Sequence, residues 1–194
     1  MNKELILEAA AQIIRQKGFH ATSMKDIADA VSLQKASLYH HVSNKQEILL
    51  LLLEQGLDIL TKRLQDVLQK DESVDIKIQK AMAAFFEVLF EHSDIVSVLL
   101  LEHRSLDSDL HSRHIASRDR YENLWRDLIQ EGIQSGVFRS CDPALTARSL
   151  LGVMNWTITW YRPGGPLSVK EITDHMVDLF INGLRNRSEN GTTQ

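Results

Sequence analysis

Long stretches of apolar residues at helical spacing, with few residues that break helices, most limit what this chain can fold into. The 194 residues include 3 prolines and 9 glycines. In the first stretch, Ile6, Ala10 and Ile13 follow one another at intervals of four and three, which places them on one face of a helix. Hydrophobic residues make up 43% of the chain and charged residues 25%, as in an ordinary globular protein. The sequence therefore predicts an all-α fold.

Glycines that end helices and small polar residues that cap them separate the periodic segments. These residues are Gly18, Ser23 (with Asp26), Ser43, Asn44, Gly136, Asp142 (before Pro143) and Ser168. We expect three short helices at 3–17, 24–31 and 35–42, and six longer ones at 45–70, 74–91, 94–101, 107–135, 142–161 and 168–186, followed by a polar tail from Arg187. The expected domains are residues 1–46 and 47–194.

The sequence carries no sign of secretion or of a membrane span. The N-terminus is charged and lacks a signal-peptide core, and the longest apolar run, 48–53, has six residues, far fewer than the ~20 that cross a bilayer. Cys141 is the one cysteine, so no internal disulfide forms; a redox switch at this thiol is the alternative to an inert side chain. These features predict a cytoplasmic protein.

Charge is unevenly distributed along the chain. The net charge is −4, but residues 1–49 carry six Lys or Arg and five Asp or Glu, so the remainder holds −5. Residues 30–46 contain no acidic residue and include Lys35, His40, His41 and Lys45. A short basic surface free of carboxylates on an acidic protein is what selective contact with phosphates requires.

The three short helices have the pattern of a helix-turn-helix, in which the third helix enters a DNA groove. Only Leu38 and Val42 of that helix are needed inside. Lys35 can donate to guanine, and Ala36 or Tyr39 can touch a thymine methyl group. The start of the next helix, near residues 44–45, offers backbone N–H groups to a phosphate. The side chains suited to phosphates are Thr22, Lys25, Ser37, Tyr39, His40 and Lys45.

Simpler roles remain for some of these residues. Lys35 and Lys45 can be solvated charges, and Tyr39 can be a half-buried packing residue. Neighbouring His40 and His41 point to different faces of a helix, so we expect no metal there; His103, His111 and His114 are the better candidates for a zinc site.

Residues 22–28 (TSMKDIA) and 36–49 (ASLYHHVSNKQEIL) resemble the DNA-binding domain of the TetR family of bacterial repressors, over about residues 5–50. The resemblance implies base contacts from Lys35 and Ala36. It implies phosphate contacts from Thr22, Ser37, Tyr39, His40 and Lys45. The sequence departs from the family pattern at Ser32, where Gly is usual, at Gln34, where Ser or Thr is common, at Ala36, often Gly or Pro, and at Val42, which replaces Phe.

The same resemblance implies a homodimer joined by the last two helices, a palindromic operator, and a small-molecule effector, with no cofactor and no metal. Residues 151–156 (LGVMNW) and 160–165 (WYRPGG) resemble the branch of the family that senses acyl-CoA thioesters. We expect an apolar cavity for the acyl chain and arginines for the CoA phosphates. The candidate residues are Met82, Phe86, Phe90, Met154 and Trp156 for the chain, and Arg104, Arg118 or Arg162 for the phosphates. The alternative is that Phe85, Phe86 and Phe90 are core, and that Trp156, Trp160 and Tyr161 pack in the core or the dimer.

Two other classes of function compete with a DNA-binding repressor. An enzyme finds no support in a Gly-rich phosphate loop, a metal-spaced His/Glu motif or a nucleophile elbow. A helical lipid carrier or adaptor would explain the apolar middle helices but not the carboxylate-free surface of residues 30–46.

Overall fold

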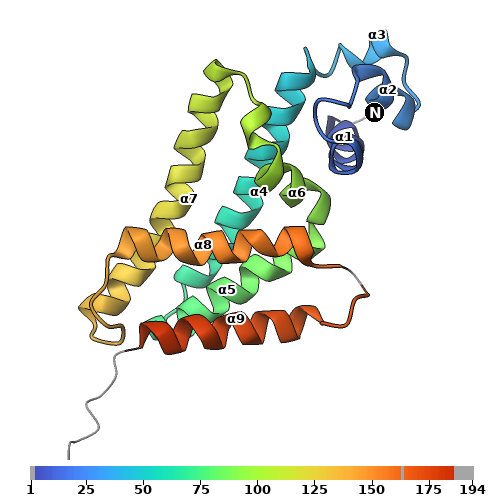
Figure 1. Cartoon of the computed structure of the whole chain (residues 1–194). Helices are drawn as coiled ribbons and strands as arrows, with labels where there is room; N and C mark the ends of the chain where they lie inside the picture. The colour runs from blue at the N-terminus through green and yellow to red at the C-terminus, as the bar shows by residue number, and fades with distance from the viewer. Residues whose placement is uncertain (1–2, 163, 186–194) are drawn as a thin grey trace, which may run out of the picture. The chain divides into compact units, whose positions relative to one another are not determined.

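The computed structural model describes residues 3–162 and 164–185, and in them the chain is helical (Figure 1). The predicted all-α fold is confirmed. Its helices are α1 (Lys3–Lys17), α2 (Met24–Ala30), α3 (Lys35–Leu38), α4 (Lys45–Leu68), α5 (Val74–Glu91), α6 (Ser93–Leu101), the 3-10 turn η1 (His103–Ser105), α7 (Ser108–Gln134), α8 (Pro143–Trp160) and α9 (Val169–Leu184). The predicted polar tail from Arg187 lies outside the described residues.

Contacts divide the chain into two compact units. Unit 1 comprises residues 1–60 and 91–119, and unit 2 comprises residues 61–90 and 120–194. The proposed domain boundary at residue 46 stays a prediction. No helix among the described residues is both long enough and apolar enough to cross a membrane.

Unit 1 is built on α1, which packs against α2 and α6. Ile6 and Ala10 are inaccessible to solvent, as the helical spacing predicted, and Ile14 is buried beside them, whereas Ile13 is only half-buried. Ile27 of α2 and Leu38 of α3 are also inaccessible to solvent, so α2 and α3 are held by one small core. The polar faces of both short helices remain outside.

The caps that fix these helices agree with the sequence. Gly18 follows α1 with φ of 84° and donates its N–H to the carbonyl of Ile14 at 2.7 Å, the left-handed ending that glycine favours. Ser23 and Asp26 form a reciprocal capping box at the start of α2. Asn44 accepts the N–H of Glu47 at 2.8 Å and so caps α4.

The third helix is shorter than predicted. The expected helix at 35–42 ends at Leu38, and residues 39–41 form turns. The N–H groups of His40 and His41 bond to carbonyls three residues back, at Ser37 and Leu38, which is the tighter 3-10 pattern. The prediction for 39–42 was therefore wrong, because this tightening leaves a single α-helical turn.

Ser32, in the turn between α2 and α3, has φ of 55°, a conformation that costs a non-glycine residue about 1 kcal/mol or more. This is the position where the family pattern favours glycine. We expect Ser32→Gly to raise the free energy of unfolding by up to about 1 kcal/mol, and Ser32→Val to lower it. Urea unfolding of both variants measures the difference; a destabilised glycine variant would contradict the strain.

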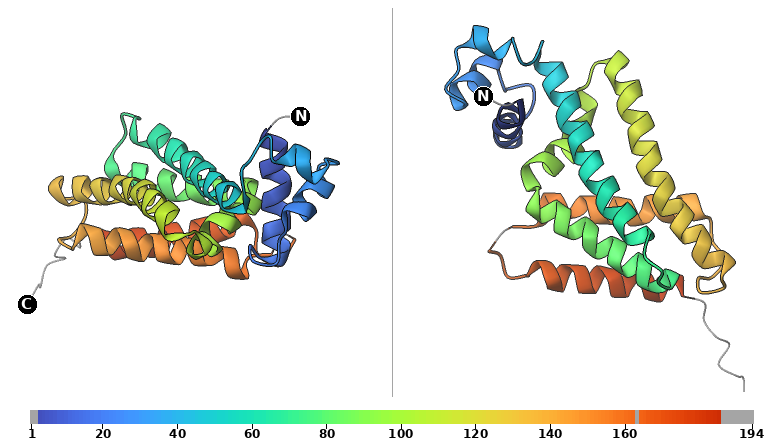
Figure 2. Two further views of the ribbon diagram at one scale, coloured as in Figure 1. Left: turned by 90° about the horizontal axis from the view of Figure 1, so that it is seen from above. Right: turned by 180° about the vertical axis from the view of Figure 1, so that it is seen from behind.

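Unit 2 brings together the end of α4, α5, the second half of α7, α8 and α9, with α8 and α9 antiparallel (Figures 1 and 2). Asp142 caps α8 by accepting the N–H of Leu145 at 2.9 Å, and Ser168 forms a capping box with Glu171 at the start of α9. After α7, Gly136 has φ of 73°. The chain then turns so that the N–H of Arg139 bonds to the carbonyl of Leu184 at 2.8 Å. This bond satisfies one of the last carbonyls of α9.

Candidate DNA-binding surface and effector-binding interior

The side chains that the sequence analysis predicted to contact DNA lie at the start of α3. Lys35 and Ala36 are exposed, Ser37 is half-buried, and Tyr39 keeps 46% of its surface accessible. His40 is exposed as well. The side chains of Lys25, Lys35, Tyr39 and His40 form neither a hydrogen bond nor an ion pair with the described residues, so their donors remain available.

Two carboxylates that flank this surface in sequence, Asp26 and Glu47, are engaged within unit 1, whereas Asp29, directly before residue 30, is exposed. Asp26 accepts the N–H of Ser23 at 2.8 Å and lies 3.1 Å from the ammonium group of Lys17. The amide of Ser23 is the main reason that the pKa of Asp26 falls to about 2. Glu47 accepts the N–H of Ser43 at 2.6 Å, which likewise lowers its pKa. Both carboxylates therefore stay ionised and hydrogen bonded to backbone N–H groups at helix starts. Neither extends freely into solvent, where it would repel a phosphate.

Lys45 is engaged inside unit 1. Its ammonium group donates to the carbonyls of Phe19 at 2.9 Å and Thr22 at 2.8 Å, with a longer contact of 3.4 Å to His20. The same group lies 4.4 Å from the centre of the Phe19 ring. An ammonium group has three donors, so a phosphate contact from Lys45 requires at least one of these bonds to be exchanged.

Thr22 is buried, with 2% of its surface exposed, and its hydroxyl donates to the carbonyl of Gly18 at 2.9 Å. The predicted phosphate contact from this hydroxyl would likewise have to replace an internal bond. In the first turn of α4, the backbone N–H groups of Lys45 and Gln46 have no acceptor among the described residues. This agrees with a helix start that can bind a phosphate.

Most of the residues predicted for the acyl chain meet in the interior of unit 2. Met82, Phe86 and Met154 are inaccessible to solvent, and Phe90 is half-buried. The rings of Phe86 and Phe90 are stacked with their centres 6.2 Å apart. Phe90 in turn lies 4.2 Å from Tyr161, just after α8. These aromatic contacts thus run from Phe86 on α5 through Phe90 to Tyr161 after α8.

The other predicted ligand residues are elsewhere. Trp156 is 66% exposed and so does not line the interior of unit 2 in the single chain. Arg104 is exposed in unit 1, as is Arg118, which pairs with Asp119 at 3.1 Å. Arg162 is exposed after α8. Of the basic candidates, Arg162 therefore lies in the same unit as the apolar ones, and Arg104 and Arg118 do not.

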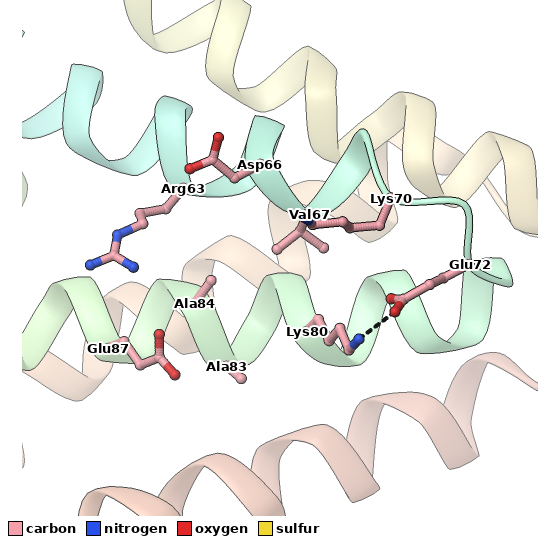
Figure 3. Close-up of a pocket in the computed structure, with 9 residues that line it drawn as sticks. All are labelled: Arg63, Asp66, Val67, Lys70, Glu72, Lys80, Ala83, Ala84 and Glu87. Atoms are coloured by element: carbon pink, nitrogen blue, oxygen red, sulfur yellow. Dashed lines mark hydrogen bonds and ion pairs between the residues drawn. The ribbon is translucent and has the colours of Figure 1, made fainter.

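A hollow of about 340 Å³ opens on the other side of α5, between that helix and α4 (Figure 3). Arg63 and Glu87 extend from the two helices at one end, and Lys80 pairs with Glu72 at the other. Ala83 and Ala84 line it between these charged ends. This lining of mixed charge does not suit an acyl chain, and none of the predicted ligand residues lies in it.

Two buried polar side chains were not among the residues predicted from the sequence to bind the effector, although His114 was a candidate zinc ligand. Thr157, one turn beyond Met154 on α8, is inaccessible to solvent, and its hydroxyl oxygen has no hydrogen-bond partner in the described part of the chain. His114 on α7 is 2% exposed, and its Nδ1 is likewise unpaired. The sequence signal that could have identified both residues is a polar side chain at a position on the buried face of an amphipathic helix. Within residues 3–162 and 164–185, no three His, Cys, Asp or Glu side chains are grouped to hold a metal ion.

Two family models match this chain. Residues 6–52 match the bacterial regulatory proteins of the tetR family, and residues 71–184 match the tetracyclin repressor-like C-terminal domain. The first match covers α1 to α3 and the start of α4, which carry the candidate DNA-binding surface.

Known transcriptional regulators are similar to this chain over nearly its whole length. The repressor KstR2 of Mycobacterium tuberculosis is 30% identical over 181 residues, covering 92% of this chain and 90% of the relative. The crystal structure of PfmR from Thermus thermophilus superposes with a TM-score of 0.85 at 35% identity, covering 93% of this chain and 99% of that one. The crystal structure of AibR in complex with isovaleryl coenzyme A and operator DNA superposes with a TM-score of 0.85 at 29% identity, covering 91% of this chain and 96% of that one. The chain therefore belongs to the TetR family and is a DNA-binding transcriptional regulator.

Proposed function

We propose that this protein is a cytoplasmic repressor that binds a palindromic operator as a homodimer and is released by a CoA thioester. The observation that carries the DNA-binding part is the surface of residues 30–46, which has no carboxylate and holds the unpaired donors of Lys35, Tyr39 and His40. Such a surface attracts the phosphates of DNA and admits base edges near Ala36.

The proposed contacts divide into two kinds. Lys35 and Ala36, exposed at the start of α3, read base edges in the major groove. Lys25, Ser37, Tyr39 and His40 bind the sugar-phosphate strands, together with the free amides at the start of α4. Thr22 and Lys45 reach phosphates only by exchanging internal bonds, so their contribution is chiefly to hold the residues around them in place.

Gel shifts on a palindrome from the upstream region of the protein's own gene test this division. Lys35→Ala should cost about 1–3 kcal/mol at one operator position and relax specificity there. Lys25→Ala should weaken binding to all sequences and reduce the log–log salt slope by about one. Lys62→Ala, which removes an exposed lysine of α4 in unit 2, is the control and should bind like the wild type. Equal losses on every duplex for both variants would refute the two roles.

Support for the homodimer comes from α8. Its outer face carries Leu145, Val153, Trp156 and Trp160 with 64%, 41%, 66% and 41% of their surfaces exposed. Apolar residues this exposed along one helix mark a surface for a partner. On α9, Leu179 is 57% exposed, and this second apolar patch agrees with an interface built from the last two helices.

Support for the effector comes from the apolar interior of unit 2 and from AibR, which binds isovaleryl coenzyme A. In the gel shift, CoA thioesters of increasing chain length should release the operator, and the same compounds should raise the unfolding temperature. Release requires that the thioester binds the DNA-free state more tightly. Thioesters that neither shift the unfolding temperature nor release DNA would exclude this effector.

A further inference from the structure

The side chain of Gln46, in the first turn of α4, holds the link between η1 and α7. Its Nε2 donates to the carbonyl of Ser105 at 2.9 Å, and its Oε1 accepts the N–H of Asp107 at 3.1 Å. These two backbone groups flank Leu106, which is buried with 8% of its surface exposed. One amide thus uses its donor and its acceptor together on a short segment of backbone, which fixes that segment against the start of α4. We call this pair of bonds the Gln46 bridge.

The Gln46 bridge ends at the start of α7. The carbonyl of Asp107 accepts the N–H of His111 at 2.9 Å, so Asp107 is the N-cap residue of that helix. Ser105 has a further contact, because its hydroxyl lies 3.2 Å from Nε2 of His20, between α1 and α2. All of these residues belong to unit 1. The bridge therefore joins the starts of α4 and α7 within one compact unit.

The same turn of α4 carries the backbone groups that are available to a phosphate. The N–H groups of Lys45 and Gln46 have no acceptor within the described part of the chain. The first turn of a helix lacks the backbone bonds that hold later turns, so side-chain bonds must keep these N–H groups in place. The ammonium group of Lys45 bonds to the carbonyls of Phe19 and Thr22, and the amide of Gln46 bonds to the start of α7. Two neighbouring side chains thus attach this turn to two different links of unit 1.

We propose that Gln46 is a positioning residue for DNA binding, which fixes the phosphate-binding start of α4 through its bridge to the start of α7. The inference rests on the proposed phosphate contact at the α4 amides. A binding group that is already ordered in the free protein loses less conformational entropy on association. Because coupling between two sites is reciprocal, DNA bound at the start of α4 should in turn stabilise the bridge. The N–H of Asp107 then responds to DNA although Asp107 lies outside the proposed contacts.

Gel shifts of the full-length protein test this role with Gln46→Met, which keeps the length of the side chain and removes the amide. The variant should bind both the palindrome and a non-specific duplex about tenfold more weakly, because the first turn of α4 must then be ordered on binding. The log–log salt slope should not change, since no Lys or Arg contact is lost. Gln46→Asn, which keeps the amide but is one methylene group too short for the bridge, is the second variant and should show the same loss.

Amide hydrogen exchange, followed by NMR, tests the coupling itself. In the wild type, either duplex should slow the exchange of the Asp107 N–H at least about fivefold, because DNA stabilises the bridge that protects this group. In Gln46→Met and Gln46→Asn, DNA should leave that exchange rate unchanged.

Two further variants are matched controls. Gln65→Met changes another glutamine of α4, which is exposed and lies in unit 2, and should behave as the wild type in both measurements. Arg15→Gln removes the ion pair with Asp94 at 2.6 Å, which loosens unit 1 at another place, and should keep the response of Asp107 to DNA. A role of Gln46 in folding alone predicts that Arg15→Gln loses this response as well.

Wild-type affinity of Gln46→Met, or slowing of Asp107 exchange by DNA in that variant, would overturn the role of Gln46. The two duplexes separate this outcome from failure of the proposed function. A phosphate contact does not depend on base sequence, so a wild-type protein that binds both duplexes equally refutes the operator proposal and still tests Gln46. A wild-type protein that binds neither duplex refutes both.

Discussion

Gly132→Ala should lower the free energy of unfolding by about 3 kcal/mol, and the unfolding temperature by about 10 °C. A Cβ on Gly132 would lie 2.0 Å from Cδ2 and 2.3 Å from Cε2 of Phe138, far inside van der Waals contact. The ring is 1% exposed and cannot swing into solvent. The N–H of Phe138 also donates to the carbonyl of Gly132 at 2.9 Å, so the two residues cannot separate without losing that bond.

Two variants make this result specific to the contact. Gly183→Ala, on α9, adds a Cβ with nothing within 4 Å, and should change stability by less than about 1 kcal/mol. Phe138→Ala removes the clashing ring atoms, so the double variant Gly132→Ala, Phe138→Ala should be more stable than the sum of the single losses indicates. Thermal and urea unfolding give the stability of the wild type, the three single variants and the double variant. Wild-type stability of Gly132→Ala would contradict the packing of Phe138 against α7.

Lys45→Met should destabilise unit 1 by about 2–3 kcal/mol and abolish operator binding. Methionine keeps most of the side-chain volume but removes the donors that hold the carbonyls of Phe19 and Thr22. These carbonyls belong to the link between α1 and α2, which positions α2 and, through it, α3. Hydrogen bonds from a charged donor are about twice as strong as neutral ones, so their loss should weaken this link more than the loss of neutral bonds would.

Lys35→Met is the control, since Lys35 is exposed on α3 and its loss should leave stability within about 0.5 kcal/mol of the wild type. Urea unfolding and the salt dependence of operator binding separate two roles of Lys45. A residue that only binds a phosphate would leave stability unchanged and reduce the salt slope by about one. That combination would refute the internal role of Lys45.

The sequence predicted features that depend on neighbours along the chain. The capping box of Ser23 and Asp26, the glycine ends of α1 and α7, and the Asp142 cap each involve residues within a few positions. Their hydrogen bonds could be read from spacing alone. The order and bounds of most helices follow from these signals and from the apolar stripes between them.

Features set by distant residues could not be read in the same way. Lys45 bonds to carbonyls more than twenty positions earlier, so its spacing in the motif suggested a phosphate contact and not an internal one. Trp156 carries an apolar side chain at helical spacing, but whether it faces the interior depends on how α8 is rotated against its neighbours. That the buried Nδ1 of His114 forms no hydrogen bond with the described residues likewise becomes visible only when the atoms around it are placed.

The shortness of α3 bears on how much sequence information the protein can extract from DNA. A single helical turn, Lys35–Leu38, brings only the first few side chains to base edges, so each subunit of the proposed dimer recognises a short half-site. A short base sequence occurs by chance many times in a genome, and affinity for one half-site discriminates poorly among these copies. The spacing between the two half-sites must therefore carry much of the discrimination, and lengthening that spacing by half a helical turn of DNA should weaken operator binding as much as changing the half-site sequences does.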